Sequence, residues 1–215
     1  MLLLCIEYNR VLMGFYRKFV LPHLINLAMR NKESARCRSQ IIPQARGRVL
    51  EVGIGSGLNL PFYSNGVAEV YGIDPSRELL QLARKTAASV AFPVEFVNGS
   101  AEELPLEGQT IDTIVMTWTL CSIPDTNKAL HEMWRVLKPG CDLLFVEHGL
   151  APEPKVNAWQ NRLNRPWRAI AGGCNLNRKI DSLIRSAGFT LVELDANYLP
   201  GPKPFTYTYR GRARK

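Results

Sequence analysis

The feature that most constrains this chain is a glycine-rich loop that joins two strand-like segments. The sequence LEVGIGSG at residues 50–57 runs from an apolar strand into the loop, and YGIDP at residues 71–75 follows as a second strand that ends in Asp74. Glycine lets a backbone turn tightly and approach a ligand closely, because no Cβ intervenes. A carboxylate about 20 residues after such a loop can accept both hydroxyls of a ribose. The two segments therefore predict a pocket for a nucleoside-bearing cofactor.

The spacing of the glycines indicates which cofactor fits. Gly53, Gly55 and Gly57 form G-x-G-x-G, whereas the loop that wraps a dinucleotide pyrophosphate has G-x-G-x-x-G. No Lys-Ser/Thr pair follows, so the loop is not a phosphate-binding P-loop. Glu51 stands just before the loop, where a carboxylate would repel a phosphate but suits a sulfonium and an ammonium. S-adenosylmethionine carries both, and an ordinary strand-to-helix turn is the alternative interpretation.

The order of strands and helices predicts the fold class. Strand-like runs lie at residues 48–52, 69–73, 94–98, 110–117, 142–147, 190–195 and 205–210. Helices are expected at residues 12–29, 57–63, 76–89, 125–137 and 177–187. This alternation predicts an α/β, Rossmann-like fold with a seven-stranded, mostly parallel sheet and helices on both faces. The short proline-rich link at residues 198–204 predicts an antiparallel last strand.

Charge divides the chain of 215 residues into three parts. The net charge is +6 over residues 1–47, −6 over residues 48–149 and +8 over residues 150–215. We expect a helical leader or lid, then the core that binds S-adenosylmethionine, then a cap over the acceptor pocket with the C-terminal part of the same domain. The basic flanks suit an anionic membrane surface, nucleic acid or an acidic substrate, or are simply solvated. No interleaved basic and aromatic motif supports a nucleic-acid partner.

Signals for export, membrane insertion and metal binding are weak. The apolar start, residues 1–6, is too short to span a membrane and lacks a basic leader and a cleavage site. Residues 12–29 predict an amphipathic helix that packs on the domain, with contact to a membrane surface as the alternative. The five cysteines are scattered without a C-x-x-C pattern, so neither a disulfide framework nor a metal site is expected. We expect a cytoplasmic protein, with a peripheral membrane location as the alternative.

Further motifs follow in a recognisable order. They are GSAEELP at residues 99–105, DTIV at residues 112–115 and RVLKPG at residues 135–140. With the glycine loop and Asp74, they make the chain resemble a class I S-adenosylmethionine-dependent methyltransferase of the type 11 kind. Later pieces narrow the resemblance to the methyltransferase-like group that includes animal thiol S-methyltransferases. Those pieces are residues 119–123, Glu147-His148, Trp167, residues 173–176 and residues 207–209.

The resemblance implies a set of residues around the cofactor. In chain order they are Glu51, Gly53, Gly55, Gly57, Asn59, Asp74, Pro75, Ser100, Ala101, Glu102, Thr117 and Leu120. Glu51 and the glycines are expected along the methionine part, and Asp74 at the ribose. Residues 100–102 are expected at the adenine, and Thr117 with Leu120 near the reacting methyl. Ser100 replaces the Asp of many relatives, which weakens the expected bond to the adenine amino group.

The expected chemistry asks for few catalytic groups. A sulfonium methyl is already activated, so positioning and desolvation supply most of the rate. His148 is the candidate base for a protonated nucleophile such as a thiol, whose pKa is about 8.5; a packing role is the alternative. Trp159, Trp167, Arg168 and Asn175 are candidates to contact the acceptor, although Asn175 is more simply a helix N-cap.

The expected activity is methyl transfer to a small or medium apolar acceptor, with a thiol favoured by the resemblance alone. The alternatives are N-methylation of a phospholipid headgroup, methylation of RNA, and a non-catalytic protein that binds the cofactor. Cys121 and Cys174 are expected to be small buried side chains, because direct transfer needs no covalent enzyme intermediate.

Overall fold

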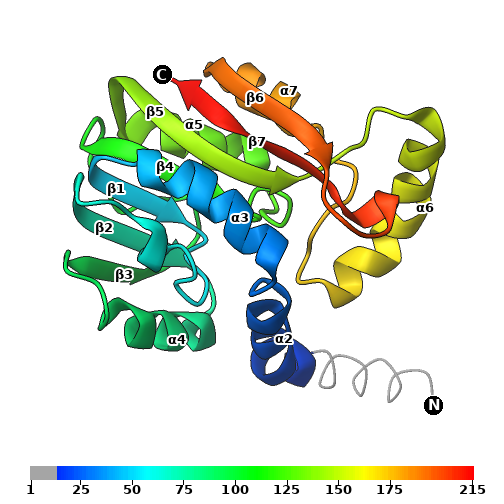
Figure 1. Ribbon diagram of the computed structural model, residues 1–215, viewed down its shortest axis with the longest axis horizontal. Coiled ribbons are helices and arrows are strands. Elements are labelled where there is room, and N and C mark those ends of the chain that lie inside the picture. Colours follow the sequence, from blue (N-terminus) through cyan, green and yellow to red (C-terminus); the bar gives the residue numbers. More distant parts are fainter. Residues whose placement is uncertain (1–13) are drawn as a thin grey trace.

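A computed structural model of the chain describes residues 14–215, without the side chains of Arg17 and Lys18. The predictions for residues 1–13, including the start of the leading helix, lie outside the described residues. Seven strands form one sheet in the order β3-β2-β1-β4-β5-β7-β6 (Figure 1). The strands are β1 (Gly47–Val52), β2 (Val67–Asp74), β3 (Val94–Asn98), β4 (Ile111–Thr117), β5 (Leu137–His148), β6 (Thr190–Tyr198) and β7 (Tyr207–Arg214).

The strand directions confirm the predicted fold class. The five neighbouring strands β3, β2, β1, β4 and β5 are all parallel to one another. Strand β7 is antiparallel to both of its neighbours, β5 and β6. Parallel neighbours must be joined by crossover connections. From β1 the chain adds β2 and β3 on one side of the sheet and then returns to add β4 and β5 on the other side, so the strand order reverses between β1 and β4. Ligands of open α/β sheets bind at the carboxyl ends of the strands beside such a reversal.

Helices cover both faces of the sheet. They are α2 (Leu21–Ala28), α3 (Lys32–Ile41), α4 (Arg77–Ala87), α5 (Thr126–Val136), α6 (Pro154–Ile170) and α7 (Ile180–Ser186). A short π-helix, η1 (Tyr16–Val20), precedes α2, and the 3₁₀ turns are η2 (Ile42–Gln44), η3 (Leu60–Phe62) and η4 (Lys203–Phe205). In Figure 1, α3 crosses one face, with α5 and α7 behind the sheet and α2 and α6 beyond the carboxyl ends of the central strands. No helix in residues 14–215 is long and apolar enough to cross a membrane.

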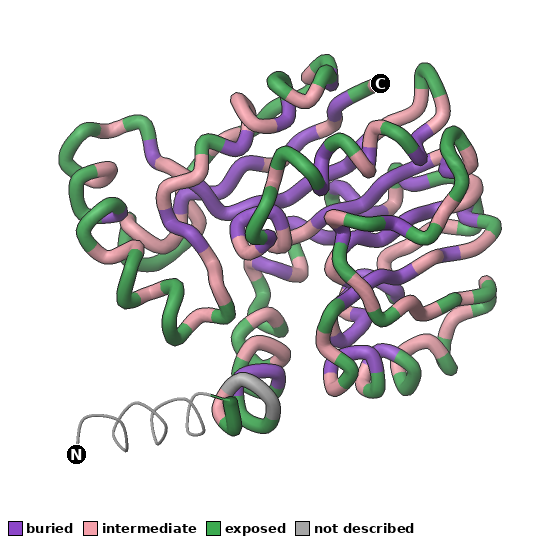
Figure 2. The backbone as a smooth tube through the Cα atoms, turned by 180° about the vertical axis from the view of Figure 1, so that it is seen from behind, coloured by how far each residue is buried: buried purple, intermediate pink, exposed green. Residues whose placement is uncertain are grey.

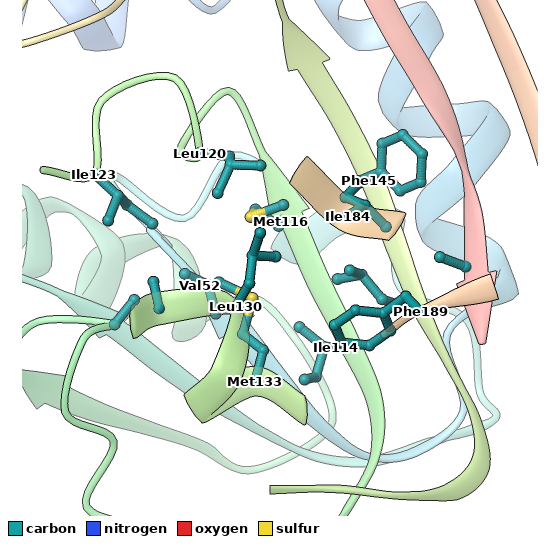
Figure 3. Packing of buried hydrophobic residues seen from close by; sticks show 14 of the residues in the cluster. Val52, Ile114, Met116, Leu120, Ile123, Leu130, Met133, Phe145, Ile184 and Phe189 are labelled. Atoms are coloured by element: carbon teal, nitrogen blue, oxygen red, sulfur yellow. The ribbon is translucent and has the colours of Figure 1, made fainter. Parts of the chain in front are cut away.

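The core follows from the two-residue period of the central strands. Ile114 and Met116 point to one face of β4 and join a buried cluster with Phe145 (Figure 3), whereas Val115 points to the other face. Cys37 of α3 and Val49 belong to the cluster on that second face. Because both faces are covered, the central strands read as nearly continuous apolar runs and are the most buried part of the chain (Figure 2).

Capping side chains set the starts of two helices where the sequence predicts them. The Ser76 hydroxyl accepts a hydrogen bond from Leu79 N–H at 3.2 Å, and the Asp125 carboxylate accepts one from Lys128 N–H at 3.0 Å. The last helix instead begins at Ile180, and its N-cap is Lys179, four residues beyond Asn175. The interpretation of Asn175 as a helix N-cap is therefore wrong.

The helix predicted at residues 57–63 does not form. The segment contains only the 3₁₀ turn η3, and Gly57 has φ +77°. Pro61 disfavours helical dihedrals at the residue before it and donates no backbone hydrogen bond. A turn at Asn65 and Gly66 soon follows, which leaves too few residues for an α-helix. The helices α3 and α6 are present although the sequence analysis did not predict them individually.

Candidate functional site

A cavity of about 970 Å³ opens at the carboxyl ends of the central strands. One wall is formed by the loops that follow β1, β2, β3 and β4. The opposite wall comes from α2 and from the end of α6, which the structure brings together although they are far apart in sequence. The Tyr16 hydroxyl donates to the Ile170 carbonyl at 2.8 Å and ties η1, which directly precedes α2, to the end of α6. The cavity therefore lies between the sheet edge and a helical cover.

The glycine loop and Asp74 form one hydrogen-bonded unit. Gly55 N–H donates to Asp74 Oδ2 at 3.0 Å, and Ser76 N–H donates to Oδ1 at 2.8 Å. Asp74 is 7% exposed, and burial raises the pKa of its carboxyl group above the ordinary value. A Cβ on Gly55 would meet no atom closer than 3.9 Å, so its backbone faces the open cavity. A ligand can approach this backbone directly, with the carboxylate beside it.

The other two glycines of the motif serve packing. A Cβ on Gly53, whose φ is +70°, would lie 2.2 Å from Thr119 Oγ1 in the loop after β4. A Cβ on Gly57 would lie 3.2 Å from Ala83 Cα of α4. Glycine at these positions lets the loop fit between β4 and α4.

Glu51 lies behind the cavity wall and at the centre of a polar network. Its carboxylate accepts hydrogen bonds from Asn59 Nδ2 at 2.9 Å and from the Tyr63 hydroxyl at 2.8 Å. Asn59 Nδ2 also donates to Thr117 Oγ1 at 3.0 Å, and Asn59 Oδ1 accepts from Arg38 Nε at 3.0 Å. Burial raises the pKa of Glu51 to about 7, against the opposing hydrogen bonds. Asn59, rather than Glu51, thus presents this network to the cavity.

Most of the residues predicted around the cofactor come together. Those that line the cavity are Gly53, Gly55, Asn59, Asp74, Pro75, Ser100, Ala101 and Thr117. Glu51, Gly57, Glu102 and Leu120 do not line it. Glu102 instead accepts a hydrogen bond from Asp125 N–H at 2.7 Å, and Leu120 is fully buried in the core.

Glu147 and His148 point to different surroundings at the end of β5. The fully buried Glu147 carboxylate accepts backbone hydrogen bonds from Thr119, Leu120 and Cys121 at 2.8, 3.0 and 3.3 Å. It therefore holds the loop after β4, and burial raises its pKa to about 8. His148 lines the cavity, and among the described residues its buried Nε2 has no hydrogen-bond partner.

Two cysteines lie beside His148. His148 Nδ1 is 3.7 Å from Cys174 Sγ, and Cys121 and Cys174 both line the cavity. The neighbouring Cys121 thiol, followed by His148, lowers the pKa of Cys174, whereas the pKa of Cys121 is raised. Cys121 is 2% exposed, as expected for a small buried side chain, whereas Cys174 is only partly buried. Cys174 is therefore the better hydrogen-bond acceptor for His148.

Among the residues predicted to contact the acceptor, only Trp167 lines the cavity. Its ring lies 4.7 Å from that of Phe205, and its indole interacts with Cys174, which contributes to the lowered pKa of that thiol. Trp159 is 53% exposed, and Arg168 is exposed as well. Asn175 Nδ2 donates to the Cys121 carbonyl at 2.9 Å, so this residue holds the loop rather than a ligand.

Several residues of the cavity wall were not predicted from the sequence, and two of them, on α3 and after β4, contact each other. Arg38 of α3 is 5% exposed and lines the cavity. Trp118 also lines it, with the left-handed φ of +52° that is uncommon for a residue with a side chain. The Arg38 guanidinium carbon lies 5.0 Å from the Trp118 ring centroid. The capping residue Asn31 was an available signal for α3; no sequence signal indicated the dihedrals of Trp118.

Comparison with known proteins gives a family and several relatives. A family described as "Methyltransferase domain" matches residues 50–145. Thiol S-methyltransferase TMT1B of Rattus norvegicus is 33% identical over 163 residues, which cover 74% of this chain and 65% of that protein. Phosphatidylethanolamine N-methyltransferase of Cereibacter sphaeroides is 41% identical over 119 residues, 54% of this chain and 58% of that protein. The chain thus spans somewhat under two thirds of the length of these relatives.

The fold has solved counterparts. A crystal structure of a SAM-dependent methyltransferase from Methanosarcina mazei matches with a TM-score of 0.64 and 25% identity, covering 80% of this chain and 93% of that one. The cavity fits this cofactor class, because a buried carboxylate stands beside an open glycine backbone at the end of β2. Together these findings identify residues 50–145 as a class I S-adenosylmethionine-dependent methyltransferase domain, with S-adenosylmethionine as its cofactor.

Proposed function

We propose that the chain transfers the methyl group of S-adenosylmethionine to the thiol of a small or medium apolar acceptor. The observation that carries this proposal is His148 Nε2, a buried ring nitrogen on the cavity wall that has no partner among the described residues. A buried polar atom without a partner is costly, which favours a ligand that completes its hydrogen bonding.

Residues on the strand side of the cavity are suited to hold the cofactor. Asp74 would accept the ribose hydroxyls, Gly55 would let the ligand approach the loop, and the backbone around Ser100 and Ala101 would border the adenine. When bound, S-adenosylmethionine supplies an activated methyl on its sulfonium. The protein must then orient the acceptor, exclude water and take up the proton of a protonated nucleophile.

His148 would take up that proton. With the Nδ1 proton directed at Cys174 Sγ, the Nε2 lone pair is left without a partner among the described residues. Cys174 Sγ is within reach to accept that proton, so this tautomer satisfies both groups. A thiol has a pKa of about 8.5, so modest help from an imidazole suffices to ionise it.

The helical side of the cavity favours an apolar acceptor. Leu21 and Ile25 of α2 line it, together with Ile170 of α6 and Ile123 after β4. Apolar lining with a few polar groups is the usual composition of a small-molecule site. The likeness to thiol S-methyltransferases supports a thiol as the acceptor group.

The rim of the cavity supports a peripheral contact with a membrane surface. Leu24 and Ile170 line the cavity yet are 48% and 56% exposed, and nearby Leu27 is 71% exposed. The parts of the chain that contain this rim, residues 1–47 and 150–215, carry net charges of +6 and +8. An apolar rim formed by segments of net positive charge suits anionic lipid, from which an apolar acceptor would enter directly.

The acceptor is tested by measuring S-adenosylhomocysteine formation with separate acceptor classes. Alkyl thiols, aryl thiols, amines, phenols and phosphatidylethanolamine vesicles are each supplied with S-adenosylmethionine. We expect turnover with thiols, abolished by Asp74→Ala, a variant that removes the carboxylate expected to hold the ribose. Turnover with vesicles or amines alone would contradict the thiol assignment, but the assignment as a methyltransferase would stand.

A further inference from the structure

Arg38 is a buried cation on the wall of the cofactor cavity. Arg38 is only 5% exposed. Two other charged side chains of the described cavity wall are more accessible, because Lys32 is exposed and Glu33 is partly exposed. Asp74 is the buried anion of the same wall. Arg38 thus places a positive charge deep in the site, on an element outside the glycine motif.

The protein partners of Arg38 are neutral. Nε donates to Asn59 Oδ1 at 3.0 Å, and Nη1 donates to the Met29 carbonyl at 2.8 Å. The Trp118 ring lies against the guanidinium. In residues 14–215 no carboxylate forms an ion pair with Arg38, and Nη2 has no hydrogen-bond partner.

The electrostatic surroundings show that an anion would be stabilised there. Burial lowers the pKa of Arg38 to about 10, and Glu51 only partly opposes this effect. Glu51 itself contacts Asn59 and Tyr63 rather than the guanidinium. A buried charge without a partner is costly, and a carboxylate that pairs with a guanidinium in two parallel hydrogen bonds offsets that cost.

The position of Arg38 along the sheet matches one end of the cofactor. Asp74 ends β2, and the residues expected at the adenine follow β3. Asn59, the partner of Arg38, bonds Thr117 at the end of β4, on the opposite side of β1. A ligand whose adenosine lies over β2 and β3 would extend its methionine part across β1 toward β4 and Arg38.

We propose that Arg38 binds the α-carboxylate of the methionine part of S-adenosylmethionine and selects ligands that carry it. The inference rests on the cofactor assignment and goes beyond it, because it names the group that recognises the amino-acid end. Since Nη1 bonds the carbonyl of Met29 at the end of α2, binding of the carboxylate also links the cofactor to the helical cover.

Binding of three ligands tests the proposal. S-adenosylmethionine carries the carboxylate, decarboxylated S-adenosylmethionine lacks only that group, and 5′-methylthioadenosine lacks the whole amino-acid end. We expect calorimetry on the wild-type chain to show decarboxylated ligand bound about 10- to 100-fold more weakly than S-adenosylmethionine. In Arg38→Gln these two ligands should bind alike, and affinity for 5′-methylthioadenosine should stay within about twofold of wild type.

Two further variants separate recognition from folding. Arg38→Lys keeps the charge with fewer donors and should keep part of the preference for the carboxylate. Arg36→Gln, at an exposed residue of α3 outside the cavity, makes the same charge change and should behave as wild type. Circular dichroism of each variant reports folding.

Three results would overturn the inference. The first result is equal binding of S-adenosylmethionine and its decarboxylated form by the wild-type chain, a measurement that requires no variant. Another is an Arg38→Gln variant that loses affinity equally for all three ligands, which would assign Arg38 a purely structural role. Failure of the wild-type chain to bind any of the three nucleosides would instead remove the cofactor assignment and, with it, this inference.

Discussion

At the scale of single residues, His148 is the most informative side chain. A base matters only while the acceptor thiol is protonated, so the need for His148 should depend on the pKa of the thiol. We expect His148→Gln to lower kcat/KM by about 100-fold for alkyl thiols. The loss should shrink to a few-fold for aryl thiols that are ionised at the assay pH. Steady-state rates over a series of thiols of graded pKa measure this dependence.

The matched control for His148 is His131, an exposed histidine on α5 whose ring bonds the Asn127 carbonyl. His131→Gln should leave the rates unchanged. An equal loss across all thiols in His148→Gln would contradict the role as a base and indicate packing.

Glu51 gives a prediction for stability against pH. Its pKa is raised from 4.5 to about 7 in the folded chain, so the protonated form is the one that favours folding. The contribution is fully present below pH 4.5 and is lost as the pH rises through about 7. Over this range the free energy of unfolding of wild type should fall by up to about 3 kcal/mol more than that of Glu51→Gln.

Glu51→Gln is a suitable comparison because an amide can still accept from Asn59 and donate to the Tyr63 hydroxyl. Urea denaturation at a series of pH values measures the difference between the two proteins. Parallel profiles would mean that Glu51 does not titrate in this range in the folded chain.

At the scale of elements, the contact between the loops after β1 and β4 shapes the site. Gly53 and Gly140 have similar φ values of +70° and +75°, but only Gly53 faces a neighbour, the Thr119 side chain. Gly140→Ala should therefore lower the free energy of unfolding by about 1 kcal/mol, through backbone strain alone. Gly53→Ala should lower the free energy of unfolding by about 1–3 kcal/mol more than Gly140→Ala, because its Cβ also clashes with Thr119. It should also weaken S-adenosylhomocysteine binding.

Combining Gly53→Ala with Thr119→Ala removes the clashing hydroxyl and methyl groups and should restore part of the loss. Urea denaturation and calorimetry measure both quantities. Equal effects of the two single glycine variants would show that the loops do not require this close approach.

The same elements show what the sequence could and could not predict. The central strands, α4 and α5 were predictable because apolar periodicity and the capping residues Ser76 and Asp125 act locally. The glycine loop and Asp74 were predictable because strand order brings their ends together. The failed helix at residues 57–63 shows how Pro61 overrides a motif that elsewhere opens a helix.

Other parts of the site depend on long-range packing. Arg38 reaches the cavity only because α3 crosses the sheet and packs on β5 and β7. Glu51 is displaced from the cavity because Asn59 and Tyr63, several residues later, close over its carboxylate. Such contacts join residues through tertiary structure, and no local pattern records them.

At the scale of the whole molecule, the apolar rim and the basic flanks predict binding to anionic vesicles. We expect the pair Leu24→Ser and Leu27→Ser to weaken co-sedimentation with such vesicles by about tenfold or more, because both side chains are exposed on α2, at or next to the cavity rim. The matched control is Val192→Ser with Leu194→Ser, which are comparably exposed on β6. An equal effect of the two pairs would contradict a specific membrane contact at the rim.

We have proposed that the cavity moves a methyl group from S-adenosylmethionine to sulfur. The most direct measurement supplies S-adenosylmethionine with a deuterium-labelled methyl and one alkyl thiol, and follows the label by mass spectrometry. We predict that the labelled methyl appears on the thiol sulfur, one for each S-adenosylhomocysteine formed. Label that stays on the cofactor with a panel of thiols, despite saturating cofactor binding, would contradict the account.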